Sequence, residues 1–288
     1  MNDTFIILNP AARGERAQRR RARVEELVGS SSLVYATSRT GEAESCARRA
    51  VKEGFPKIVA AGGDGTVHEV VNGIAGSETT LGVLPLGTMN VFANEIGLPL
   101  HDLDRCWRVI QGEHTRLVDL PLANRRSFVQ LGGVGLDAQV VKETSDSFRR
   151  NFGPVSYLVA AAQIAARKPP RLSIESENAS TQEGSFVLVG NGRLYGGPFP
   201  FFKHAVVDDG LLDVVVFKRL GYLEIIKYLQ DVIFSSEIRT PEVEYFQTRK
   251  LQVGSEEEVP VELDGELIGN CPVEFTVRDR ALRVLVPK

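Results

Sequence analysis

The sequence is poor in the residues that mark several common protein classes. It contains three cysteines in 288 residues, Cys46, Cys106 and Cys271, and their spacing fits neither a zinc site nor a redox pair. A disulfide-stapled secreted domain is therefore excluded, and reduced thiols in a cytoplasmic protein are expected. No apolar run approaches the roughly eighteen residues that a membrane-spanning helix needs, and the first ten residues do not resemble a signal peptide. Any contact with a membrane is expected to be peripheral.

The chain also lacks a strong charge of one sign. With 34 basic and 37 acidic residues its net charge is -3, which gives no general attraction for nucleic acid. Six arginines crowd residues 13–23, diluted by Glu15, Glu25 and Glu26. This segment is interpreted as a solvated helix face, with contact to anionic lipid or nucleotide phosphate as the alternative. The four histidines have no metal-binding spacing.

The first half of the chain alternates short apolar runs with amphipathic segments. This alternation predicts a parallel sheet covered by helices on both faces. Beyond about residue 125, alternating runs joined by short turns predict a β-rich second domain, with helices only near 138–167 and 221–234. The predicted strands of the first half are 5–8, 33–36, 57–61 and 81–85, and its helices are 15–28, 41–53 and a segment following residue 66.

Residues 60–73, AAGGDGTVHEVVNG, place three glycines between an apolar strand and a helix. A helix N-terminus presents unpaired backbone N–H groups, and glycine lets an anion approach them. The turn is therefore interpreted as a phosphate site. The alternative is a tight turn in which Asp64 and Thr66 only cap the helix.

The other predicted strands of the first half also end in polar turns, at residues 9–14, at Thr37 and at residues 85–90. In open α/β sheets, ligands bind beyond the carboxyl ends of the strands. Four such turns at one edge of a sheet indicate a single polar site of phosphate size.

Several motifs, in this order, resemble the catalytic domain of diacylglycerol kinases, in particular the soluble bacterial lipid kinases. The resemblance covers essentially the whole chain. GGDGT alone also resembles turns in NAD kinases and phosphofructokinases, whereas the ordered combination is specific. The motifs are LNPAARG at 8–14, GGDGT at 62–66 with HEVVNG at 68–73, PLGTMNVFANEIGLP at 85–99, VGNGRLYGG at 189–197, VVDDGLLDVVVF at 206–217 and ELDGE at 262–266.

The resemblance implies a kinase that uses ATP and Mg²⁺ to phosphorylate a lipid hydroxyl, with diacylglycerol converted to phosphatidic acid as the leading reaction. It implies a parallel α/β nucleotide-binding domain of the NAD kinase and diacylglycerol kinase type at 1–122. A β-sandwich-like domain is expected at 123–288, and the last strand, about 280–288, either closes it or returns to the first domain. The enzyme is expected in the cytoplasm, reaching a membrane lipid peripherally, and a homodimer is left open.

Site residues follow from the resemblance, position by position. Asp264 is implied as the general base with Glu266 as its acidic neighbour, and the choice of base between them is left open. The implied ATP contacts are Asn9, Pro10, Ala11, Ala12, Arg13, Gly14, Thr37, Gly62, Gly63, Asp64, Gly65, Thr66, Glu69, Thr88 and Asn90.

A structural magnesium site is also implied by the resemblance. Its ligands would be the Asp209 carboxylate and the backbone carbonyls of Val206 and Leu211. Asp119 matches a further aspartate of the family, which would act as a supporting acid. The chain departs from the family at Val91, where many relatives have an acid after the Asn of the GTxN motif.

Two other functions fit parts of the sequence. An NAD kinase would share the glycine turn, although it leaves DDGLLDV and LDGE unexplained. A nucleotide-binding regulatory or lipid-carrier protein without turnover is the second alternative, supported by Val91 alone. Phe199, Phe201 and Phe202 are expected in the core, with a lipid entrance as the alternative.

Overall fold

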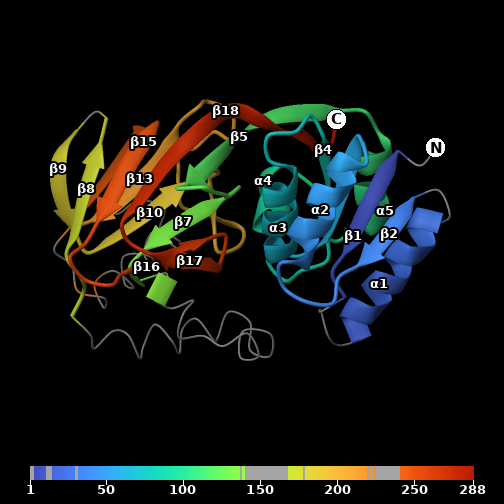
Figure 1. Ribbon diagram of the computed structural model, residues 1–288, viewed down its shortest axis with the longest axis horizontal. Helices are drawn as coiled ribbons and strands as arrows, with labels where there is room; N and C mark the ends of the chain where they lie inside the picture. Colours follow the sequence, from blue (N-terminus) through green and yellow to red (C-terminus); the bar gives the residue numbers. More distant parts are fainter. Residues whose placement is uncertain are drawn as a thin grey trace. The chain divides into compact units, whose positions relative to one another are not determined.

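A computed structural model describes residues 3–10, 15–29, 32–136, 138–139, 168–177, 179–218, 221, 224 and 241–288 (Figure 1). The helices predicted near 138–167 and 221–234 fall almost entirely outside these residues. The chain divides into two compact units. Unit 1 comprises Met1–Leu120, Gly196–Pro198 and Asp279–Lys288, and unit 2 comprises Pro121–Tyr195 and Phe199–Arg278.

Unit 1 contains the predicted parallel sheet, with strand order β2-β1-β3-β4-β18. The final residues of the long strand β18 (Val273–Leu285) run parallel to β4, where Val284 pairs with Leu81. The C-terminal end of the chain therefore belongs to unit 1. The strands are β1 (Thr4–Leu8), β2 (Leu33–Ala36), β3 (Lys57–Gly62) and β4 (Thr80–Pro85), close to the predicted ranges.

Helices cover both faces of this sheet. The chain moves outward from β1 to β2 and back from β2 to β3, so right-handed crossovers place α1 on one face and α2 and α3 on the other. Gly73 of α3 lies so close to α2 that an added Cβ would approach Ala47 Cβ to 2.5 Å. The helices are α1 (Glu15–Val28), α2 (Glu42–Lys52), α3 (Asp64–Ile74), the short α4 (Val91–Glu95) and α5 (Leu103–Gln111).

Unit 2 is built from antiparallel strands. One sheet has the order β14-β13-β10-β7-β16-β17, and the first half of β18 pairs with β15, which continues to β8 and β9. The strands are β5 (Thr115–Ala123), which begins in unit 1, β6 (Arg126–Ser127), β7 (Leu131–Val134), β8 (Leu172–Ser176), β9 (Ala179–Gly184), β10 (Phe186–Gly190), β11 (Leu194–Tyr195), β12 (Phe199–Pro200), β13 (Leu212–Phe217), β14 (Val243–Thr248), β15 (Lys250–Gly254), β16 (Pro260–Leu263) and β17 (Glu266–Asn270).

The four central strands of the six-stranded sheet of unit 2, β13, β10, β7 and β16, are buried on both faces. In β10, Val187 and Val189 face the core shared with β8, β15 and β18, while Phe186 and Leu188 face a second core. This alternation follows from the two-residue period of a strand. Phe201 and Phe202 complete the second core with exposures of 5% and 0%, so the core interpretation is confirmed for both.

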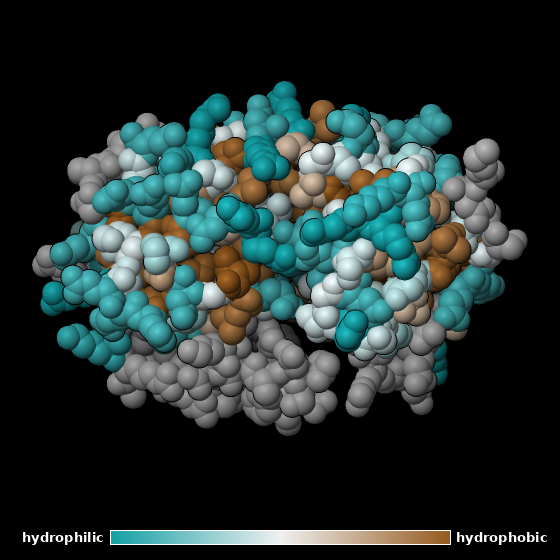
Figure 2. Space-filling model, in the orientation of Figure 1, coloured by the Kyte–Doolittle hydropathy of each residue, from teal (hydrophilic) through white to brown (hydrophobic). Residues whose placement is uncertain are grey.

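Hydrophilic side chains cover most of the face seen in Figure 2, with apolar patches between them. Few large apolar side chains are exposed among the described residues: Leu33 and Val34 are neighbours in β2, and Leu117, Val206 and Leu267 lie in other parts of the sequence. Isolated exposed apolar residues are ordinary on protein surfaces. Within the described ranges, none of the helices combines the length and apolar character needed to cross a bilayer.

Candidate functional site

The glycine-rich turn joins β3 to α3 in unit 1. Gly63 is the N-cap of α3 and has no side chain with which to cap this helix start. The alternative interpretation, in which Asp64 and Thr66 only cap the helix, stays a prediction. The Thr66 hydroxyl accepts a hydrogen bond from Asn9 Nδ2 at 3.0 Å. An added Cβ on Gly62 would lie 2.3 Å from the same Thr66 oxygen, so glycine is required for Thr66 to reach Asn9.

The turn after β4 packs directly against the glycine-rich turn. Leu86 N–H donates to Gly62 O at 2.9 Å, and an added Cβ on Gly87 would lie 2.5 Å from Gly63 Cα. This contact requires glycine at position 87, whereas a Cβ on Gly63 would lie 3.2 Å from Gly87 Cα and would need only a small shift of the backbone. Two of the turns predicted to share a site are therefore brought together.

Asn90 holds the second turn in shape. It adopts a left-handed conformation, with φ of 49°, which Asn tolerates well. Its Oδ1 accepts a bond from Gly87 N–H at 2.9 Å, and its Nδ2 donates to Gly87 O at 2.8 Å. Asn90 therefore shapes the turn from a buried position, whereas Thr88 in the same turn is exposed.

The turn between β2 and α2 is occupied by carboxylates. Glu69 Oε1 and Oε2 accept the N–H groups of Gly41 and Ala43 at 2.8 and 2.9 Å, at the start of α2. Hydrogen bonds to the Glu42 carboxylate, first from the Tyr35 hydroxyl and then from Ser38, lower the pKa of Glu42 to about 2. The positive end of α2 therefore already faces two anions of the chain itself.

Other predicted ATP contacts have different positions. Thr37 is buried, and its N–H donates to Leu8 O at 2.9 Å, next to Asn9. Pro10 lies in the turn after β1, whereas residues 11–14, which include Ala11, Ala12, Arg13 and Gly14, lie outside the described part of the chain.

Asp119 is fully buried in β5. Its Oδ1 accepts the backbone N–H of Arg280 at 2.7 Å. Arg280 has φ of 48°, so this bond holds β18 at a position where its backbone leaves the extended conformation. The geometry gives Asp119 a part in fastening the C-terminal strand within unit 1.

The predicted magnesium ligands occupy one turn in unit 2. Asp209 N–H donates to Val206 O at 3.4 Å, and Leu211 N–H donates to Asp209 Oδ1 at 3.0 Å. One carboxylate and two carbonyl oxygens are hard ligands that suit Mg²⁺. Among the described residues, no three His, Cys, Asp or Glu side chains gather as a metal cluster, but the proposed set uses a single side chain.

Strand β14 supports this turn from the side. The Tyr245 hydroxyl donates to Asp213 Oδ1 and accepts the N–H of His204 at 3.3 Å. Gln247 Nε2 donates to Asp213 Oδ2 at 3.4 Å. Burial raises the pKa of Asp213 to about 6, and burial and Asp213 together raise the pKa of Tyr245 above its ordinary value.

Asp264 lies at the tip of the β16–β17 hairpin. Asp264 and Gly265 have φ of 49° and 86°, so both central residues of this two-residue turn are left-handed. The carboxylate points toward the start of β7. Its Oδ2 accepts Val129 N–H at 2.9 Å, and its Oδ1 accepts Gln130 and Leu131 N–H at 2.9 and 3.0 Å. Three backbone donors therefore fix the orientation of this side chain.

The residues that hold Asp264 were not predicted as site residues. In the sequence, residues 129–131 look like the ordinary start of a strand. They lie 133–135 positions before Asp264, so no local pattern could have indicated these contacts. Glu262 supports the same hairpin by accepting Gly265 N–H at 2.8 Å. Glu266, half-buried, begins β17 directly after the turn.

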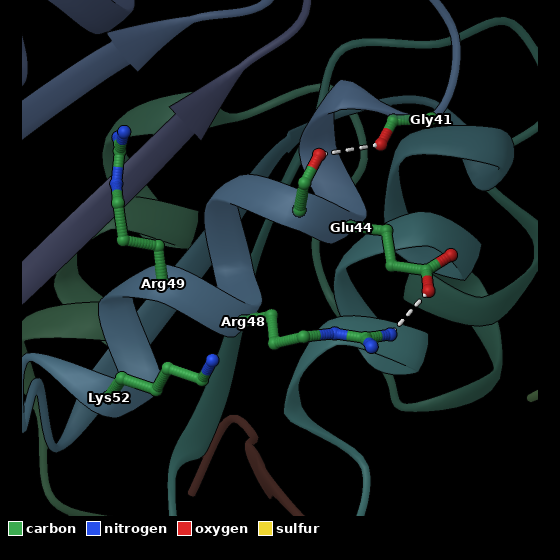
Figure 3. Close-up of a pocket in the computed structure, with 6 residues that line it drawn as sticks. Gly41, Glu44, Arg48, Arg49 and Lys52 are labelled. Carbon is green, nitrogen blue, oxygen red and sulfur yellow. Dashed lines mark hydrogen bonds and ion pairs between the residues drawn. The ribbon is translucent and has the colours of Figure 1, made fainter.

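A separate hollow of about 490 Å³ lies on the exposed face of α2 (Figure 3). Figure 3 shows Arg48 turned toward Glu44, with which it forms an ion pair of 2.6 Å. The Arg49 guanidinium lies 5.3 Å from the centre of the Tyr35 ring. Arg48 and Arg49 are thus engaged with neighbours on or beside their own helix, as on a solvated helix face. The lining residues are Gly41, Glu44, Ser45, Arg48, Arg49 and Lys52.

Comparison with known proteins accounts for both units. Residues 3–122 match the diacylglycerol kinase catalytic domain, and residues 132–286 match the YegS C-terminal NAD kinase beta sandwich-like domain. A diacylglycerol kinase of Staphylococcus haemolyticus is 32% identical over 267 residues, which cover 91% of this chain and 81% of the relative. A diacylglycerol kinase of Bacillus subtilis is 28% identical over 295 residues, covering 100% and 97%.

Solved structures show the same fold. A diacylglycerol kinase crystal structure from Bacillus anthracis matches with a TM-score of 0.74 and 22% identity, covering 99% of this chain and 97% of that one. A further crystal structure from the same organism matches with a TM-score of 0.80 and 24% identity over the same shares. The two domain matches and the full-length relatives together show that the chain belongs to the diacylglycerol kinase family of lipid kinases.

Proposed function

We propose that the protein transfers the γ-phosphoryl group of ATP to a lipid hydroxyl, with diacylglycerol as acceptor and phosphatidic acid as product. The observation that carries the proposal is the packing of the β3–α3 turn against the β4–α4 turn at the carboxyl edge of a parallel sheet. Such an edge is where open α/β sheets bind ligands. The names of the full-length relatives support diacylglycerol as the acceptor.

The nucleotide phosphates would bind at the start of α3. Its N-cap, Gly63, has no side chain of its own to cover this helix start, and the glycines allow close approach of an anion. The start of α2 is a poorer phosphate site, because Glu69 already accepts two of its N–H groups. Thr37 and Glu69 would therefore contact a part of the nucleotide other than phosphate.

Two groups of unit 2 would complete the chemistry. Mg²⁺ offsets phosphate charge and orients phosphoryl oxygens when it is bound. The turn at Val206, Asp209 and Leu211 would hold a structural ion. Asp264, fixed by its three backbone donors, would accept the proton of the lipid hydroxyl, with Glu266 as the alternative base.

The enzyme would act in the cytoplasm and meet its lipid at a membrane surface, because diacylglycerol resides in bilayers. The homodimer stays a prediction.

The test is an acceptor panel. The full-length protein is incubated with labelled ATP, Mg²⁺ and, separately, diacylglycerol, phosphatidylglycerol, ceramide, sphingosine or NAD. We expect label on diacylglycerol in mixed micelles, and label on NAD instead would favour an NAD kinase. ATP binding by calorimetry without transfer to any acceptor would favour a regulatory or carrier protein.

Asp264→Asn is the catalytic control for this panel. Asparagine keeps the left-handed turn, and loss of an acid/base group lowers turnover by about 10² to 10⁴. Because its Nδ2 would face a backbone N–H, the melting temperature is measured alongside. Wild-type turnover in a folded Asp264→Asn would remove Asp264 from the mechanism.

A further inference from the structure

Asn191 follows strand β10 and is fully buried in unit 2. Its backbone N–H donates to Gln130 O at 2.9 Å, and its Nδ2 donates to Val129 O at 3.0 Å. One residue therefore binds the carbonyl side of the same segment whose N–H side binds Asp264.

These contacts form two continuous hydrogen-bond chains. A peptide group that accepts a bond at its carbonyl is polarised to donate more strongly at its N–H. The peptide joining Val129 to Gln130 accepts from Asn191 Nδ2 and donates to Asp264 Oδ1. The next peptide, joining Gln130 to Leu131, accepts from Asn191 N–H and donates to the same oxygen. Both chains begin at Asn191 and end at Asp264 Oδ1.

The surrounding strands fix the register of these chains. Leu131 pairs with Gly190, the residue before Asn191, and Gly132 pairs with Leu263, the residue before Asp264. Asp264 N–H also donates to Leu131 O at 2.8 Å. Asn191 and Asp264 therefore hold opposite edges of the start of β7.

We propose that Asn191 is a positioning residue for Asp264, acting through these two peptide groups on the orientation and electrostatic environment of Oδ1. The proposal rests on the proposed function in so far as Asp264 takes part in phosphoryl transfer. The coupling of Asn191 to the N–H groups that bind Asp264 does not depend on the activity and can be tested without it.

Ser185, at the other end of β10, provides a control residue whose buried hydrogen bonds have only a structural role. The buried Ser185 hydroxyl donates to Phe217 O at 3.1 Å and to Lys218 O at 2.8 Å. These bonds also join a side chain to the backbone of a neighbouring strand, but they end at carbonyls that do not face Asp264. Ser185→Ala therefore controls for loss of a buried bond at this strand.

Asn191→Leu is a suitable variant, since leucine has similar volume and no donor. Asn191 Oδ1 is buried without a hydrogen-bond partner within the described residues. Removing an unsatisfied oxygen offsets part of the lost Nδ2 bond, so a net stability loss of the order of one hydrogen bond is expected. The folded variant can then be assayed.

The experiment combines amide hydrogen exchange with kinetics. In Asn191→Leu we expect exchange at Gln130 and Leu131 about tenfold faster or more, because their acceptor is less well held. We expect kcat about 10- to 100-fold lower with the KM for ATP within about twofold, since small misplacement of a reacting group lowers turnover rather than nucleotide binding. Ser185→Ala should keep wild-type kcat and exchange at these two amides.

The outcomes separate the two proposals. Wild-type kcat and wild-type exchange in folded Asn191→Leu would overturn the positioning role, as would an equal loss of kcat in Ser185→Ala. If wild type phosphorylates no acceptor of the panel, the proposed function fails, while the exchange comparison still decides whether Asn191 controls the groups that bind Asp264.

Discussion

Individual glycines in this protein serve different physical purposes. Gly63 and Gly87 allow two backbones to touch, and Gly62 makes room for the Thr66 hydroxyl. Gly76, which follows α3, has φ of 81° and no neighbour within 4 Å of an added Cβ. A side chain at Gly63 would thus disturb the packing of two turns as well as the approach of an anion, and loss of ATP binding there would not by itself prove a phosphate contact.

A pair of alanine variants separates turn packing from backbone strain. Gly87→Ala places a Cβ 2.5 Å from Gly63 Cα, so the two turns must move apart. We expect ATP affinity to fall about tenfold or more, or about 1.4 kcal/mol, in titration calorimetry. Gly76→Ala should cost about 1–2 kcal/mol of stability through left-handed strain while keeping ATP affinity.

Equal ATP affinities of wild type and folded Gly87→Ala would show that the contact between the turns does not shape the nucleotide site. A comparable fall in affinity in Gly76→Ala would mean that general destabilisation explains the loss.

At the scale of one element, the start of α2 shows how a helix terminus can be satisfied internally. Gly41, its N-cap, has no side chain, and Glu69 of α3 supplies the missing acceptors. Glu42 closes the preceding turn by binding Tyr35 and Ser38. Both α2 and α3 begin at a glycine N-cap, and at α2 the carboxylate of Glu69 takes the place of a capping side chain.

The Glu42 contacts predict a dependence of stability on pH. The pKa of Glu42 falls from 4.5 to about 2 on folding, so the ionised carboxylate stabilises the fold above pH 4.5. This stabilisation is lost as the pH falls through about 2. The melting temperature of Glu42→Gln should therefore lie below that of wild type at neutral pH, with the difference shrinking on acidification.

Tyr35→Phe is the matched variant, because it removes the largest cause of the pKa shift and leaves the carboxylate in place. It should show the same trend with smaller amplitude. A difference between wild type and Glu42→Gln that stays constant down to about pH 2 would contradict the assigned contacts.

Periodicity predicted the elements of unit 1 well because local patterns decide them. The predicted helix at 15–28 and strand at 33–36 have the bounds of α1 and β2. The partners of Asp264 could not be predicted in this way, since Val129 lies 135 residues away and only strand pairing brings the two together. Similarly, the fastening of Asp119 to Arg280 depends on the path of β18, over a separation of 161 residues.

On the scale of the whole molecule, unit 1 is discontinuous in sequence. Its sheet order ends in β18, so β4 has a neighbour on this side only when Asp279–Lys288 is present. The returning segment also contributes the buried side chains of Leu282, Val284 and Leu285. Residues 1–120 alone therefore lack part of their own core.

Truncation after Arg278 tests this dependence. Fully burying each of three large apolar side chains contributes about 1.5–3 kcal/mol, and typical domains are stable by only about 5–15 kcal/mol. We expect circular dichroism to show loss of the cooperative unfolding of unit 1, whereas deletion of Lys288 alone should have little effect. A truncated chain with wild-type melting would show that the returning strand is dispensable.

The path of β18 also constrains the order in which the protein can mature during translation. The ribosome delivers β4 long before Asp279–Lys288, and all of unit 2 is made in between. Throughout that interval the nascent β4 has an open edge, which is the kind of surface that recruits other strands into aggregates. Unit 1 can therefore complete its sheet only after residues 279–288 have been synthesised. Slow elongation, or a premature stop late in the message, would leave the sheet of unit 1 incomplete.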